Sequence, residues 1–175
     1  EQRLRGHDKA PPSPPPGDGG DSPAWSAHRH PYQAPEKKEH EGDGVPYAEL
    51  HVHSSFSFLD GVSAPEKLVE QAAELGLKGL GLTDHNGFYG AVRFAEAAAA
   101  HQMPTVFGAE ITLGTSPPRA DSPDPPGAHL LALAKGKTGY HQLSAALTQA
   151  HLATEEKGTM TADLGVLAEH AQGEW

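Results

Sequence analysis

The 175-residue sequence contains no cysteine. Disulfide bridges and thiolate metal sites are therefore excluded, and any metal must be held by histidine and carboxylate ligands. Basic residues are also scarce, because 13 lysines and arginines face 23 aspartates and glutamates, for a formal net charge of −10. Such a chain repels a phosphate backbone, so binding of nucleic acid by this segment alone is disfavoured. The 12 histidines and the many carboxylates suit cations instead.

Long apolar runs are absent too. No stretch of about 18 apolar residues is available to span a bilayer, and residues 1–5 lack the apolar core of a secretion signal. We therefore expect a soluble, cytoplasmic protein with no membrane partner. The sequence also begins without methionine and reaches Trp175 soon after a helical pattern. From both ends we expect a fragment of a longer protein, made of one domain and an arm.

Residues 1–45 are predicted to form a disordered or loosely attached arm. Between Pro11 and Val45, proline, glycine and charged residues dominate, and apolar residues are too sparse to offset the entropy lost on ordering. The large aromatics of this stretch are Trp25 and Tyr32. They are either isolated side chains in a linker or anchors that dock the arm on another surface.

From residue 46 onward, apolar periodicity predicts alternating strands and helices. Strands are expected at residues 47–53, 79–82, 105–111 and 130–134. Helices are expected at residues 63–75, from Val92 to before Pro104, from Thr138 to about Leu152, and from Thr161 to near His170. Residues 115–127 form a proline-rich loop between the third and fourth strands.

Several residues are expected to mark helix boundaries. Ser63 is expected to cap the first helix, with Glu66 closing a capping box, and Gly76 to end it, while Thr161 caps the last helix. The order β-α-β-α-β-loop-β-α-α favours parallel strands in an α/β sheet or barrel. Because barrels of this kind usually have eight strands, the four predicted strands amount to about half of one.

Histidine and carboxylate side chains follow three of the predicted strands. His51 and His53 are two residues apart on a strand, so both imidazoles leave the same face and can converge on a cation. Asp60, in a turn with Gly61, can return a carboxylate toward the end of that strand. His85 follows the second predicted strand, at the strand end where α/β folds place their sites.

Glu110 ends the third predicted strand, directly after the apolar run 106–109. A buried carboxylate needs hydrogen bonds, a cationic partner or a metal, so we expect Glu110 to join the histidines. His129 precedes the fourth strand and is a weaker candidate, with which His141 and His151 on the following helix compete. The coincidence of three strand ends, rather than any single residue, predicts a metal site.

The same residues resemble the opening motifs of the PHP (polymerase and histidinol phosphatase) superfamily. The motifs that carry the resemblance are His51-Val52-His53-Ser54, Ser57-Phe58-Leu59-Asp60-Gly61, Leu82-Thr83-Asp84-His85-Asn86-Gly87 and Phe107-Gly108-Ala109-Glu110. Residues 59–61, 87–94 and 136–140 are similar to the alpha subunits of bacterial C-family DNA polymerases. Residues 17–26 and 150–158 are similar to the error-prone branch, especially its actinobacterial members.

The resemblance implies a partial PHP-type distorted β/α barrel, TIM-like, over residues 46–175, incomplete at its carboxyl end. It places metal ligands at His51, His53, Asp60, His85 and Glu110, and less surely at His129. A complete site would hold up to three divalent ions (zinc, manganese or iron), and Asp84 would orient a ligand rather than bind metal. The later ligands and the polymerase aspartates have no counterpart in this sequence.

The resemblance also implies a function for the longer protein. It would be a DNA-directed DNA polymerase, a nucleotidyltransferase of translesion synthesis after DNA damage. Its partners would be the rest of its own chain, DNA, nucleotides and other translesion-synthesis proteins. The PHP region would be a metal-dependent phosphoesterase or 3'-5' exonuclease, or a structural module that metals stabilise. A stand-alone phosphatase of the histidinol-phosphate type is the alternative.

Overall fold

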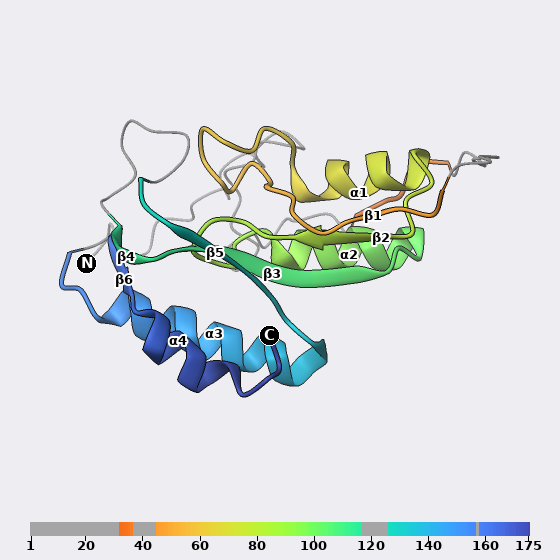
Figure 1. Ribbon diagram of the computed structural model, residues 1–175. Coiled ribbons are helices and arrows are strands. Elements are labelled where there is room, and N and C mark those ends of the chain that lie inside the picture. Colours follow the sequence, from red (N-terminus) through yellow and green to blue (C-terminus); the bar gives the residue numbers. More distant parts are fainter. Residues whose placement is uncertain (1–31, 37–44, 117–125, 157) are drawn as a thin grey trace, which may run out of the picture. The chain divides into compact units, whose positions relative to one another are not determined.

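The computed structural model describes residues 32–36, 45–116, 126–156 and 158–175. Its main sheet has four strands in the order β1-β2-β3-β5, and it curls like part of a barrel (Figure 1). The strands are β1 (Ala48–Glu49), β2 (Gly79–Leu82), β3 (Thr105–Thr112) and β5 (His129–Leu133). A second sheet pairs β4 (Gly114–Ser116) with β6 (Met160–Ala162). The predicted α/β class is therefore confirmed.

Four helices cover the main sheet in two pairs (Figure 1): α1 (Pro65–Glu74) with α2 (Ala91–His101), and α3 (Gly136–Leu152) with α4 (Leu164–Ala171). The first pair packs with β2 around Val69, Leu82 and Phe94, which are almost fully buried. The second pair packs against β3 and β5 around Ile111 and Leu143. Within the described ranges, no helix is both long and apolar enough to cross a bilayer.

The predicted parallel pairing holds for β1, β2 and β3 but is wrong for β5, which runs antiparallel to β3. Thr112 pairs with His129, and Leu113 N donates to Ala128 O at 2.8 Å, so the chain leaves and returns side by side. Strands connected in this way are antiparallel, whereas parallel strands require a crossover, usually helical. No helix was predicted between these two strands, and this was the signal for a hairpin.

Two of the predicted helix caps are also wrong. Ala64, without a side-chain hydrogen bond, stands at the start of α1, and the Ser63 carbonyl accepts a hydrogen bond from Ser55 N instead. Thr161 lies in β6, a strand that was not predicted, and Asp163 caps α4 by accepting from Gly165 N and Val166 N. The predicted stop at Gly76 is confirmed, because its φ of 70° ends α1.

Tyr32 is the described aromatic of the predicted arm. Its hydroxyl donates to Glu70 Oε1 at 3.1 Å and lies 2.8 Å from His101 Nε2, so it joins α1 to the end of α2. Burial, together with the hydrogen bond to Glu70, raises the pKa of the Tyr32 phenol above its ordinary value. Tyr32 is thus docked, while Trp25 and the predicted disorder of residues 1–31 and 37–44 lie outside the described residues.

β1 is shorter than predicted, but the chain continues beside β2 as an extended segment up to His53. Thr83 N donates to Val52 O at 2.9 Å, and Val52 N donates to Thr83 Oγ1 at 3.0 Å. Gly81 allows this approach, because a Cβ there would lie 2.8 Å from Leu50 O and 2.9 Å from Leu50 Cα. The histidine-bearing segment therefore depends on a glycine of β2.

We predict that Gly81→Ala lowers the free energy of unfolding by roughly 1–3 kcal/mol, the usual cost of overpacking. Gly79→Ala is the matched control on the same strand, because the nearest atoms to its Cβ would be at 3.5 Å, an ordinary contact. The control is expected to leave stability unchanged or to raise it by up to about 1 kcal/mol. Urea unfolding followed by circular dichroism compares the two variants, and equal losses would contradict the prediction.

Candidate metal centre

Glu110 is the centre of a cluster of imidazoles. It lies on β3, where Ala109 and Ile111 face α3 and Glu110, by strand alternation, faces the other way. Its Oε2 contacts His51 Nε2 and lies 3.0 Å from His53 Nε2, and its Oε1 lies 2.6 Å from His129 Nδ1. One carboxylate, only 8% exposed, thus gathers three histidines.

Asp60 extends the cluster on the other side of His53. Its Oδ2 contacts His53 Nδ1 and lies 3.2 Å from Nε2 of His85, a buried side chain. His53 therefore uses one ring nitrogen toward Asp60 and the other toward Glu110. The imidazoles of His53 and His85 lie close together, with ring centroids 4.4 Å apart.

The pairing of β2 with β3 continues past the end of β2 and sets His85 beside Glu110. These two residues form a parallel bridge, in which Glu110 N donates to Asp84 O at 3.2 Å and Asn86 N donates to Glu110 O at 2.9 Å. The side-chain amide of Asn86 forms two hydrogen bonds with Thr112: it accepts from the backbone N at 2.8 Å and donates to Oγ1 at 3.1 Å. Because Thr112 pairs with His129, these two hydrogen bonds also help to position His129.

Asp84 fixes the turn that carries Asp60. Its carboxylate is buried and accepts three hydrogen bonds of 2.7 Å, from Ser54 N, Ser54 Oγ and Ser57 Oγ. The Ser57 carbonyl in turn accepts from Asp60 N at 3.0 Å and from Gly61 N at 2.8 Å. The turn closes so tightly that a Cβ on Gly61 would lie 1.9 Å from Ser54 O. Asp60 is thereby brought back to the histidines.

Ser54, Ser57 and the Asn86–Thr112 pair were not singled out from the sequence. Both serines are fully buried, although serine is mostly a surface residue. The available signal was the run of three serines at 54, 55 and 57 between His53 and Asp60. A polar run between two predicted ligands indicates hydroxyls that support the site, but their partner, Asp84, is distant in sequence.

The electrostatics of the cluster favour an ionised Glu110. Burial raises the pKa of this carboxyl. Hydrogen bonds from His51 and His129 and attraction to His85 together have a larger effect in the opposite direction, and they lower the pKa to about 2. The group is therefore an anion at neutral pH. An anionic carboxylate surrounded by imidazole nitrogens is a donor set for a divalent cation.

The ligand atoms of the described residues form three overlapping groups, each within 4.8 Å: His51-His53-Glu110, His53-Asp60-His85 and His85-Glu110-His129. Each group contains two imidazoles and one carboxylate, a set that suits zinc, manganese and iron. All the predicted ligands thus lie together. His141 is exposed on α3 outside these groups, and His151 Nε2 lies 2.8 Å from Asn86 O, so His129 is the better placed of the three.

The model of the PHP domain family matches residues 49–174, the part of the chain that contains this cluster. The chain belongs to the PHP family. The predicted resemblance is therefore confirmed, and so is the α/β fold with a partial barrel. Family and donor sets together favour binding of divalent metal.

Curated relatives of this PHP chain are error-prone DNA polymerases of actinobacteria. The polymerase of Nocardia farcinica is 47% identical over 91% of this chain and 17% of its own length. That of Mycolicibacterium paratuberculosis is 57% identical over 86% of this chain and 14% of its own length. That of Cutibacterium acnes is 55% identical over 77% of this chain and 12% of its own length. The chain thus spans less than a fifth of the length of these relatives.

A solved structure from Bifidobacterium adolescentis also aligns with the PHP chain. The alignment has a TM-score of 0.45 and 29% identity, and it covers 63% of this chain and 35% of the other.

Replacement of Asp84 by asparagine is expected to lower the free energy of unfolding by roughly 1–3 kcal/mol, because a neutral amide with one acceptor oxygen replaces an anion that accepts hydrogen bonds through both of its oxygens. The matched control is Ser54→Ala, which removes one of the three hydrogen bonds to the carboxylate and the bond from Phe56 N to Ser54 Oγ, and leaves the carboxylate with the backbone N of residue 54 and Ser57 Oγ. Its loss should be smaller. Chemical denaturation measures both, and an Asp84→Asn variant as stable as the parent would refute the role given to Asp84.

Proposed function

We propose that His51, His53, Asp60, His85, Glu110 and His129 hold divalent metal ions. The observation that carries the proposal is the sharing of ligands: His53, His85 and Glu110 each belong to two of the three groups. Isolated surface histidines seldom share carboxylates in this way, and a buried carboxylate with three imidazoles around it needs positive charge nearby. The ligand list stays the one expected from the sequence.

When bound, divalent ions supply a positive charge that holds a phosphate group, lowers the pKa of water and stabilises the leaving oxygen. The residues of this chain would bind the ions and hold the ligand side chains in position. Glu110, already ionised, offers two oxygens to different histidines, and Asp84 keeps Asp60 in reach through Ser57. Asn86 secures the end of β3 beside His85. We propose that further ligands come from residues beyond Trp175.

For the whole protein, we propose an error-prone DNA polymerase, in which this chain is the amino-terminal PHP region. The proposal is supported by the names of the relatives and by the small share of their length that the chain spans. Such a protein adds nucleotides to DNA during translesion synthesis in the cytoplasm, with other translesion-synthesis proteins as partners. Its PHP region would act as a metal-dependent phosphoesterase or 3'-5' exonuclease.

A second candidate is a structural role for the metals. The ligands come from the segment after β1, the ends of β2 and β3, and the start of β5. Ions held there would cross-link four parts of the sheet without any turnover. The reading frame after Trp175 separates both candidates from a stand-alone phosphatase, since continuation over several further domains favours a polymerase and a stop within about one domain length favours a phosphatase.

We expect His53→Ala to lower the metal content of the purified full-length protein, because His53 belongs to two of the three ligand groups. His141→Ala, on the exposed face of α3, is the control and should keep the parent's stoichiometry. Inductively coupled plasma mass spectrometry gives metal per protein. Unchanged metal in the His53 variant would remove this residue from the proposed ligands.

Hydrolysis is tested separately on a 3'-labelled single-stranded oligonucleotide with the metal-loaded full-length protein. Turnover that disappears in His53→Ala and persists in His141→Ala supports an exonuclease. Full metal occupancy without detectable hydrolysis, combined with a lower melting temperature after chelation, refutes the exonuclease and favours the structural role.

A further inference from the structure

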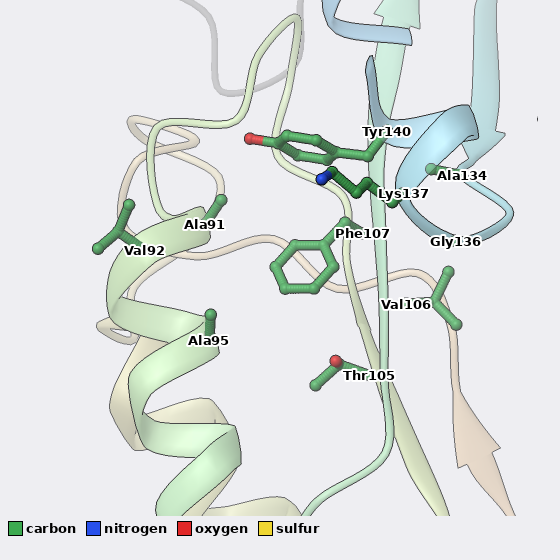
Figure 2. A pocket seen from close by; sticks show the side chains of 10 residues that line it. All are labelled: Ala91, Val92, Ala95, Thr105, Val106, Phe107, Ala134, Gly136, Lys137 and Tyr140. Atoms are coloured by element: carbon green, nitrogen blue, oxygen red, sulfur yellow. The ribbon is translucent and has the colours of Figure 1, made fainter. Parts of the chain in front are cut away.

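A pocket is lined by the first residues of β3 (Figure 2), at the opposite end of this strand from Glu110. It has a volume of about 450 Å³, within the range of small-molecule sites. Its walls come from α2, from the first residues of β3, from the residue that follows β5, and from the start of α3: Ala91, Val92, Ala95, Thr105, Val106, Phe107, Ala134, Gly136, Lys137 and Tyr140. None of these residues belongs to the metal-ligand groups, so the pocket is a separate feature.

The walls of this pocket are apolar and partly aromatic. The rings of Phe107 and Tyr140 meet edge to face, with centroids 6.0 Å apart and planes at 77°. The α2 side offers short side chains, two alanines and a valine, and these leave the space open. Such walls favour a compact apolar group and disfavour a sugar phosphate, whose many hydroxyls would find few hydrogen-bonding partners.

Positive charge in the pocket lining comes from a lysine. Figure 2 shows the Lys137 amine lying along the Tyr140 ring, with both side chains extending over Phe107 toward α2. Lys137 is the one charged side chain among the described residues that line the pocket. Gly136 opens α3 here, and Lys135 provides no side-chain cap, so the positive end of the helix dipole adds to the charge. Although the chain has a net charge of −10, the positive charge at Lys137 favours a ligand with an anionic group.

We propose that this pocket binds a small amphiphilic anion: a compact apolar ring system with one sulfonate, carboxylate or phosphate group. The rings lie between α2 and Phe107, and the anionic group lies at Lys137. The apolar walls and the single cation complement the two ends of such a molecule. The three elements that line the pocket come together only in the folded chain, so the ligand binds the folded state and stabilises it by mass action.

The first test is a fluorescence titration of the full-length protein with 8-anilinonaphthalene-1-sulfonate, which has this chemistry. Ala95→Phe fills the pocket, whereas Ala100→Phe places the same ring on an exposed position on another face of α2. We expect a saturable site in the parent and in Ala100→Phe that is lost in Ala95→Phe. Equal binding by both variants, or no saturable binding in the parent, overturns the proposal.

The second test isolates the charge. N-phenyl-1-naphthylamine has the same rings without the sulfonate. Lys137→Gln is expected to weaken binding of the sulfonate by about fivefold, the order of one partly exposed ion pair, and to leave binding of the neutral dye unchanged. Lys78→Gln, which changes an exposed lysine that does not line the pocket, is the control. Equal effects of Lys137→Gln on the two dyes refute the part given to Lys137.

Discussion

The shared use of the Glu110 carboxylate is the constraint on which the rest of the site depends. Burying an ionised carboxylate is costly unless nearby groups compensate for lost water, and here three imidazoles do so. These imidazoles come from different parts of the sheet, so the segment after β1 and the antiparallel strand β5 must both meet β3 at one level. The hairpin register Thr112 to His129 and the bridge of His85 to Glu110 meet this requirement.

Much of the site was predictable because its ligands follow strand ends, and strand ends are visible as the limits of apolar runs. His51, His53, His85 and Glu110 are of this kind. The direction of β5 was predicted wrongly, because apolar periodicity is the same for parallel and antiparallel strands. The absence of a predicted helix between the third and fourth strands indicated a hairpin, and this signal was not used. The predicted helix caps at Ser63 and Thr161 were wrong because each residue has a partner that is not visible in the local sequence. The Ser63 carbonyl accepts from Ser55 N, and Thr161 pairs with Thr115 of β4.

β3 has two different environments along its length. Its first residues line an apolar pocket, and its last residues carry Glu110 and pair with β5. Gly108 is the first β3 residue that pairs with β5, and β5 approaches it so closely that a Cβ there would lie 2.4 Å from Ala132 O. Ala109 and Ile111 pack with α3 in one core cluster, whereas Phe107 packs against the cluster of α1 and α2, so the two ends of β3 contribute to different parts of the core.

The double contacts of His53 have a thermodynamic consequence for the proposed metal centre. A ligand that belongs to two groups cannot be positioned for one without being positioned for the other. Filling the first position therefore changes the free energy of filling the next, and the events are linked equilibria with a coupling term that acts in both directions. Metal occupancy would then not follow from independent affinities of separate positions, because binding at one position would change the affinity of the next.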